Sequence, residues 1–165
     1  MNGRDSVGKT LIISPEKCTG CRTCEVACSF RKTDSFNPQN SAVTVYQYDE
    51  AAISIPVMCM QCEDPKCMKV CTTGAIYKDE NDTVLIDRKK CIGCKLCIIA
   101  CHFGNISYNY EQKTLVKCDL CGGDPQCAKL CPSGTIQFKE ATSAQLSKKK
   151  ALAEKFKSLL EEVEK

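Results

Sequence analysis

The chain has 165 residues, a formal charge of +3, and a hydrophobic fraction of 43% that already includes its sixteen cysteines. A chain of this length without tryptophan has room for one domain or two very small ones, and its thin apolar core needs cross-links or metals. The basic charge gives no support to a nucleic-acid partner, because it counts every thiol as neutral and bound thiolates would make the assembled protein acidic.

The N-terminal sequence predicts a cytoplasmic protein without direct membrane insertion. Residues 1–5 contain neither an apolar signal region nor a twin arginine, and no later stretch reaches the length of a membrane span. In a reducing cytosol, dense cysteine indicates metal binding rather than disulfides. A disulfide framework is therefore the weak alternative.

Residues 3–10, GRDSVGKT, match the phosphate-binding P-loop expression in full. A P-loop follows a buried strand and opens a helix, whereas only Met1 and Asn2 precede this match and a strand-like segment follows it. We therefore do not expect nucleotide binding.

Four groups of four cysteines come next, and they alternate between a tight and a widened spacing. Residues 11–13 and 84–86 are predicted strands that lead into the first and third groups. Each of the last three groups is followed by a glycine and then an isoleucine at fixed offsets, which suggests an internal duplication. The groups are Cys18, Cys21, Cys24 and Cys28; Cys59, Cys62, Cys67 and Cys71; Cys91, Cys94, Cys97 and Cys101; and Cys118, Cys121, Cys127 and Cys131.

An insertion over residues 29–58 separates the first two groups. Its segments 43–46 and 53–55 are predicted strands joined by polar residues, so we expect them to form a hairpin. The hairpin would shield a metal centre or meet a partner.

After Phe138 the composition changes to Lys, Glu, Ala and Leu. Leu152, Phe156, Leu159 and Val163 fall on one face at helical spacing. Residues 141–165 are therefore predicted to form an amphipathic helix.

The spacing C-x2-C-x2-C-x3-C of groups one and three is the signature of bacterial 4Fe-4S binding, in which the fourth cysteine ligates a neighbouring cluster. A proline usually follows that fourth cysteine, and here only Cys131 has one. Zinc is the structural alternative, but it uses two cysteines per knuckle, and only one histidine, His102, is present. We therefore predict four 4Fe-4S clusters on the sixteen cysteines.

No general acid, nucleophile or pterin-holding constellation stands out, so the protein is predicted not to be catalytic alone. Four lysines directly precede cysteines: Lys17, Lys66, Lys90 and Lys117. They either raise cluster potentials by offsetting negative charge or are solvated surface. His102 is interpreted as a space-filling residue rather than a ligand.

From Cys18 to Ile136 the chain resembles the four-cluster ferredoxin-like subunits of molybdenum and tungsten oxidoreductases, hydrogenases and carbon monoxide dehydrogenase systems. The resemblance implies an α+β fold with two tandem bacterial-type dicluster ferredoxin modules over residues 11–140, and a C-terminal helix over 141–165. Module one would combine groups one and four, and module two groups two and three. The implied ligand sets are Cys18, Cys21, Cys24 with Cys131; Cys118, Cys121, Cys127 with Cys28; Cys59, Cys62, Cys67 with Cys101; and Cys91, Cys94, Cys97 with Cys71.

The short length, the Cys59-Met60-Gln61-Cys62 stretch and the Lys/Glu-rich tail are similar to the small subunits of tungsten aldehyde oxidoreductases and tungsten benzoyl-CoA reductases of anaerobes. This implies a soluble electron-transfer subunit between a tungsten or molybdenum catalytic subunit and a flavin subunit, a ferredoxin or another redox partner. The alternatives are a polyferredoxin partner of a hydrogenase, formate dehydrogenase or carbon monoxide dehydrogenase, and a free diffusing ferredoxin. The apolar stripe of the tail would pack on its own modules, on another subunit, or on a second copy of the chain.

Overall fold

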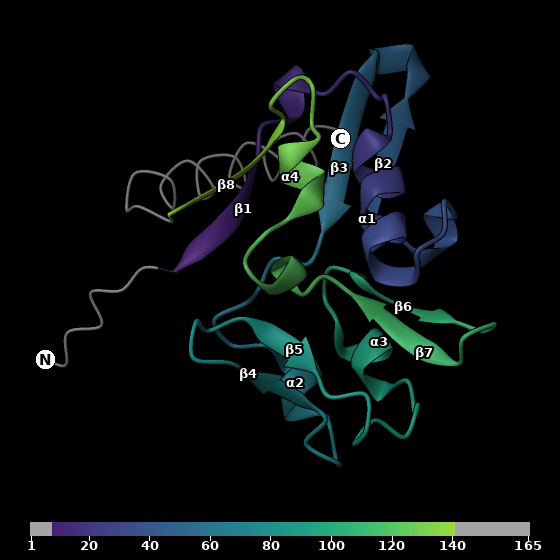
Figure 1. The fold of residues 1–165 in the computed structure, drawn as a ribbon, viewed down its shortest axis with the longest axis vertical. Helices are drawn as coiled ribbons and strands as arrows, with labels where there is room; N and C mark the ends of the chain where they lie inside the picture. The colour runs from purple at the N-terminus through teal and green to yellow at the C-terminus, as the bar shows by residue number, and fades with distance from the viewer. Residues whose placement is uncertain (1–7, 141–165) are drawn as a thin grey trace, which may run out of the picture.

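The computed structural model describes residues 8–140 (Figure 1). The described part contains short helices and four sheets, each of two antiparallel strands. The helix predicted over 141–165 lies outside the described residues. No helix within 8–140 combines the length and the apolar character that a membrane crossing needs.

The elements are short because turns and cysteine loops take up much of the chain. The strands and α-helices are β1 (Lys9–Ile13), α1 (Thr23–Thr33), β2 (Val43–Tyr48), β3 (Ile53–Met58), α2 (Lys66–Lys69), β4 (Ile76–Lys78), β5 (Val84–Ile86), α3 (Leu96–Ala100), β6 (Ile106–Asn109), β7 (Thr114–Lys117), α4 (Gln126–Lys129) and β8 (Ile136–Glu140). Single 3-10 turns are η1 (Pro15–Lys17), η2 (Pro38–Asn40), η3 (Asp49–Ala51) and η4 (Leu120–Gly122).

Three sheets join strands that are neighbours in the chain. The hairpin predicted within the insertion is confirmed as β2 and β3, which pair from Val43 opposite Met58 to Tyr48 opposite Ile53. The strands predicted at 11–13 and 84–86 are confirmed as parts of β1 and β5. Lys9, the lysine of the P-loop-like match, lies in β1, whereas a P-loop lysine opens a helix.

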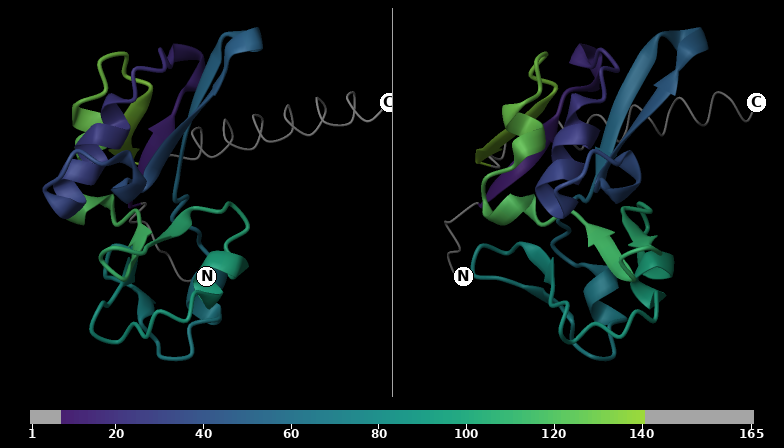
Figure 2. Two further views of the ribbon diagram at one scale, coloured as in Figure 1. Left: turned by 90° about the vertical axis from the view of Figure 1, so that its right-hand side faces the viewer. Right: turned by 45° about the vertical axis from the view of Figure 1, so that its right-hand side comes forward.

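The fourth sheet joins the two ends of the described chain. β1 pairs with β8, from Lys9 opposite Glu140 to Ile13 opposite Ile136, and the two strands lie side by side (Figures 1 and 2). Helix α1 contacts α4, and α2 contacts α3. These long-range pairings bring the first cysteine group beside the fourth, and the second beside the third.

Two hydrophobic cores result. We call them the upper core, which includes Leu11, Val43 and Met58, and the lower core, which includes Val84 and Ile106. In Figure 1 the elements of the upper core occupy the top of the view and those of the lower core the bottom. Buried cysteines take part in both cores, so cysteine side chains replace much of the usual apolar packing.

The repeated glycine and isoleucine have a structural role. Gly74, Gly104 and Gly134 adopt left-handed φ values of 63°, 61° and 65°. This conformation strains residues with a Cβ atom and lets the chain turn after each group. The isoleucine two residues later begins β4, β6 or β8, and in each case it is at most 3% exposed.

Candidate metal centres

The first and third cysteine groups lie on loops of the same backbone shape. Gly20 and Arg22, on either side of Cys21, have φ values of 68° and 56°. Gly93 and Lys95 have φ values of 70° and 64° at the equivalent positions. Arg22 and Lys95 are also the residues that precede α1 and α3. The identical spacing of these groups therefore reflects one loop conformation used twice.

The second and fourth groups share a different local motif, which the sequence reasoning missed. In both, an Asp-Pro pair precedes a four-residue helix that carries the third cysteine of the group. Asp64 pairs with Lys69 at 2.6 Å, and Asp124 pairs with Lys129 at the same distance. Hydrogen bonds from Lys69 and Lys66 lower the pKa of Asp64 to about 2. The repeated sequence pattern D-P-x-C-x-K could have revealed this motif.

A first convergence brings together the two ends of the described chain. Cys18, Cys21, Cys24 and Cys131 line one cavity. Burial raises the pKa of Cys24 to about 12, and the nearby charges of Glu25 and Cys131 add to the effect.

The insertion hairpin covers this cavity. Val45 of β2 and Pro56 of β3 line it together with the cysteines. Gln47 of β2 also accepts hydrogen bonds from the Arg22 guanidinium at 3.0 and 3.2 Å. A Cβ atom on Gly20 would lie 2.4 Å from the Gln47 amide nitrogen, so a larger residue here would displace that side chain.

A second cavity is lined by Cys71, Cys91, Cys94 and Cys97. It lies at the lower core and combines cysteines from the second and third groups. Burial raises the pKa of Cys97 to about 11, and the charge of Cys91 adds to this rise.

A third convergence joins Cys118, Cys121 and Cys127 to Cys28 of α1. Burial raises the pKa of Cys127, and the charges of Cys118, Cys28 and Cys121 raise it further. Burial is also the main cause of the raised pKa of Cys121, with Asp119 and Cys28 as smaller contributors.

A fourth convergence joins Cys59, Cys62 and Cys67 to Cys101. Burial raises the pKa of Cys62, and the charges of Cys59 and Cys101 contribute to the rise. The same two neighbours raise the pKa of Cys67, again after burial. Two cavities thus each gather three cysteines of one group and one of another, and mutual effects on thiol pKa values link the other eight predicted site residues across the groups.

The last cysteine of each group has a hydrogen-bonding partner at its sulfur. Backbone N–H groups donate to Sγ of Cys28 and Cys101, and side-chain hydroxyls lie at Sγ of Cys71 and Cys131. The partners are Ala42 at 3.3 Å, Asn105 at 3.4 Å, Thr73 at 3.7 Å and Ser133 at 3.7 Å. Such contacts stabilise negative charge on sulfur.

These donor sets fit iron–sulfur clusters. None of the sixteen cysteines forms a disulfide, and sets made only of sulfur suit iron–sulfur centres. Within residues 8–140, no three His, Cys, Asp or Glu side chains gather closely enough to hold a single metal ion. A four-iron cluster does not need such a convergence, because each cysteine binds a different iron.

The lysines that precede cysteines fall into two classes. Lys17, Lys66 and Lys90 are exposed, as is His102. Lys117 is only 5% exposed, so it is not solvated surface.

Comparisons with known proteins agree with the cysteine chemistry. Residues 51–141 match a family described as a 4Fe-4S dicluster domain, and residues 11–30 match a 4Fe-4S binding domain. The chain is 35% identical over 148 residues to the probable anaerobic dimethyl sulfoxide reductase chain YnfG of Escherichia coli (strain K12), covering 78% of this chain and 71% of that one.

A second relative is the polyferredoxin-like subunit of an aliphatic sulfonate oxidoreductase from Pyrococcus furiosus. It is 37% identical over 122 residues, which cover 73% of this chain and 70% of the relative. Among solved structures, a chain of the active site complex BamBC of benzoyl-coenzyme A reductase matches over 95% of this chain and 98% of its own length, with 24% identity and a TM-score of 0.48. That structural match is too loose to support a family assignment.

Proposed function

This chain belongs to the family of 4Fe-4S dicluster domain proteins, and from that premise we propose how its cysteines divide among clusters and how electrons cross the molecule. The protein is an iron–sulfur electron-transfer subunit of an oxidoreductase and is not catalytic alone. Its sixteen cysteines fit four 4Fe-4S clusters, which supply one-electron chemistry when bound.

We define four ligand sets, each of which holds one cluster. The shared cavities support the two outer sets, and the mutual effects on thiol pKa values support the two inner sets. The first outer set is Cys18, Cys21, Cys24 and Cys131; the first inner set is Cys28, Cys118, Cys121 and Cys127; the second inner set is Cys59, Cys62, Cys67 and Cys101; and the second outer set is Cys71, Cys91, Cys94 and Cys97.

These sets form two tandem dicluster modules within residues 11–140. Module one contains the first outer and first inner sets, and module two contains the second inner and second outer sets. The pairing of β1 with β8, the contacts of α1 with α4 and of α2 with α3, and the two separate cores support this division, which is what a duplicated ferredoxin would produce.

The four ligand sets follow one another along the molecule in the order first outer, first inner, second inner and second outer. The pKa of Cys118 is raised to about 12, mainly by burial and also by the charge of Cys59, which supports adjacent inner sets. The two exposed cysteines, Cys21 and Cys94, belong to the two outer sets. Electrons would therefore enter near one of these residues and leave near the other.

The electron-transfer partner is a molybdenum- or tungsten-containing catalytic subunit, of the aldehyde oxidoreductase or benzoyl-CoA reductase type, with a flavin subunit or a ferredoxin at the other end. The relatives are named as parts of a dimethyl sulfoxide reductase and a sulfonate oxidoreductase, which supports a multi-subunit setting. Large apolar residues near Cys94 in the sequence are exposed: Ile92 by 70%, Leu96 by 44% and Ile99 by 84%. A patch of this kind favours a fixed subunit over a free diffusing ferredoxin.

We assign the assembly to the cytoplasm, where sixteen cysteines without a disulfide stay reduced. Residues 141–165 supply a further contact between copies of the chain, because they carry an apolar stripe at helical spacing. Removal of this segment would then lower the number of chains per particle in solution, and an unchanged oligomeric state would exclude the contact.

Serine substitutions test the ligand sets. Cys131→Ser and Cys21→Ser should perturb the same electron paramagnetic resonance (EPR) signal of the reduced protein, because both residues belong to the first outer set. Cys127→Ser is the matched control: it lies in the same sequence group as Cys131 but should perturb the signal that Cys28→Ser perturbs. If Cys131→Ser and Cys127→Ser altered one and the same signal, the cross-pairing would be wrong.

A further inference from the structure

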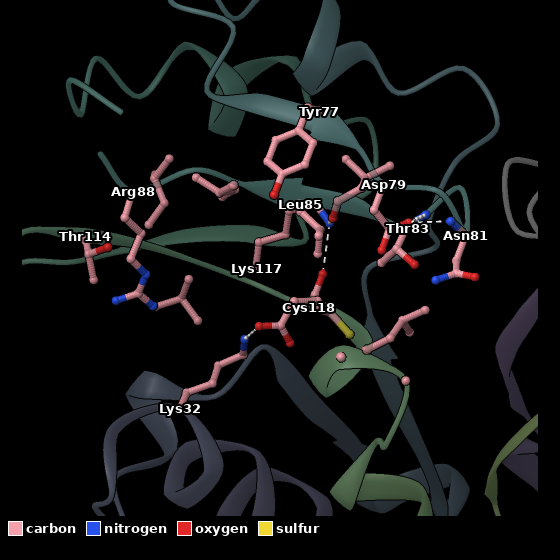
Figure 3. A pocket seen from close by; sticks show the side chains of 18 of the residues that line it. Lys32, Tyr77, Asp79, Asn81, Thr83, Leu85, Arg88, Thr114, Lys117 and Cys118 are labelled. Carbon is pink, nitrogen blue, oxygen red and sulfur yellow. Dashed lines mark hydrogen bonds and ion pairs between the residues drawn. The ribbon is translucent and has the colours of Figure 1, made fainter. Parts of the chain in front are cut away.

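Lys117 is a buried cation at the boundary between the two cores. It ends β7, and its side chain reaches toward β5 across a cavity lined by residues of both cores (Figure 3). Its Nζ donates to the carbonyl oxygen of Val84 at 2.5 Å and to that of Cys118 at 2.9 Å. Val84 belongs to the lower core and Cys118 to the upper core, so one ammonium group joins them.

The ammonium has no anionic side chain to neutralise it within the described part of the chain. No carboxylate of residues 8–140 lies within 4.0 Å of Nζ. Lys32, which lines the same cavity, pairs instead with Asp119 at 3.1 Å. A buried ammonium held only by carbonyl dipoles is costly unless net negative charge lies nearby.

Gln61 holds the same two backbone segments. It lies in the loop between Cys59 and Cys62, accepts a hydrogen bond from the Val84 N–H at 2.9 Å, and donates to the Cys118 carbonyl at 3.0 Å. Lys117 and Gln61 thus make four hydrogen bonds with the backbone of Val84 and Cys118, and Gln61 joins the loop of the second inner set to Cys118 of the first. Two of these bonds hold the ammonium in place.

Lys117 also lies beside the loop of the second inner set. Its Nζ and the side-chain amide of Gln61, which lies between Cys59 and Cys62, both donate to the carbonyl oxygen of Cys118. On the other side, Lys117 is covalently next to Cys118 of the first inner set.

We propose that Lys117 is the residue that raises the reduction potentials of the two inner clusters, by holding one fixed positive charge between the cysteine sets that ligate them. This inference rests on the ligand sets proposed above. Reduction adds one negative charge to a cluster whose thiolates already outweigh its iron–sulfide core, and a buried cation favours that reduced form. The net negative clusters supply the counter-charge that the buried ammonium otherwise lacks.

Lys117→Met and Lys117→Gln test the inference by redox titration followed by EPR, on the full chain purified without oxygen. Both variants should lower the reduction potentials of the two inner clusters by at least 59 mV, which for one electron is a tenfold change in the reduction equilibrium. Lys117→Gln keeps a hydrogen-bond donor without the charge, and Lys117→Arg keeps the charge, so Lys117→Arg should retain most of the potential. The inner signals are those altered by Cys28→Ser and Cys62→Ser.

Lys66→Gln is the matched control. Lys66 also directly precedes a cysteine of the second inner set, but its side chain is 48% exposed and pairs with Asp64. Solvent and salt screen such a charge, so this variant should shift the potential by less than a third as much. Equal shifts in the Lys66 and Lys117 variants, or no shift in either, would overturn the inference.

Iron content distinguishes a failure of the proposed Lys117 role from a failure of the proposed ligand sets. About sixteen irons per chain with unchanged inner potentials in Lys117→Met and Lys117→Gln would refute the role of Lys117 and leave the ligand sets standing. A wild-type protein without about sixteen irons would refute the ligand sets themselves. Loss of an inner cluster from all three Lys117 variants, Lys117→Arg included, would assign the residue to packing and contradict the proposed tuning.

Discussion

At the scale of single residues, hydroxyl groups distinguish the outer sets from the inner ones. Ser133 lies 3.7 Å from the Cys131 sulfur, and burial would raise the pKa of Cys131, yet hydrogen bonds from the Ile136 N–H and the Ser133 hydroxyl outweigh it and lower the pKa. Ser133→Ala should therefore lower the potential of the first outer cluster by roughly 20 to 60 mV, the value of one ordinary hydrogen bond. Redox titration of the wild type and the variant measures the shift.

The exposed Ser107 of β6 provides the control, since Ser107→Ala should leave all potentials unchanged. Thr73→Ala should act on the second outer cluster alone, because Thr73 lies 3.7 Å from the Cys71 sulfur. A shift of the same cluster in the Ser133 and Thr73 variants would contradict the assignment of these residues to different outer sets.

Cysteine spacing was enough to predict the cofactor, because cluster chemistry imposes short fixed steps along the chain. The assignment of all sixteen cysteines as ligands stays a prediction. The environment of the lysines could not be predicted in the same way. Lys66 and Lys117 both directly precede a cysteine, yet one is exposed and the other is buried. Lys117 is buried because it lies where the two cores contact each other, and no local sequence pattern encodes that contact.

At the scale of elements, one carboxylate fastens the insertion hairpin to α1. Val45 of β2 lies opposite Pro56 of β3, and its N–H donates at 2.6 Å to Oε1 of the buried Glu25. Glu25→Ala would leave this buried N–H without a partner, so it should lower the free energy of unfolding by about 1 to 3 kcal/mol. The expected result is a lower melting temperature and faster loss of the cluster beneath the hairpin.

Glu16→Ala is the corresponding control, because Glu16 is an exposed acid in η1. It should leave the melting temperature and cluster retention as they are in the wild type. Equal melting temperatures for the Glu25 and Glu16 variants would show that the carboxylate does not hold the hairpin in place.

The hairpin and the strands β1 and β5 were predictable, since apolar residues and turn residues alternate there in a local pattern. Helices α2 and α4 were not, because each has four residues and follows an Asp-Pro pair instead of showing an apolar period. The pairing of β1 with β8 spans nearly the whole described chain, so the sequence of neither strand reveals it.

At the scale of the whole molecule, a few buried polar contacts join the two cores. The Asn109 amide of β6 donates to the Asn40 side chain of η2, and both asparagines are buried. Gln61 and Lys117 make the other contacts, through Val84 and Cys118. The division into two duplicated modules stays a prediction, and these contacts are the places where such modules would be fixed at a constant separation for electron transfer.

The central claim is that the sixteen cysteines hold four 4Fe-4S clusters. The most direct test is to measure iron and acid-labile sulfide per chain on protein purified without oxygen, and to record the EPR spectrum after reduction. We predict about sixteen irons, about sixteen sulfides and signals of interacting clusters. Zinc without labile sulfide would contradict the assignment.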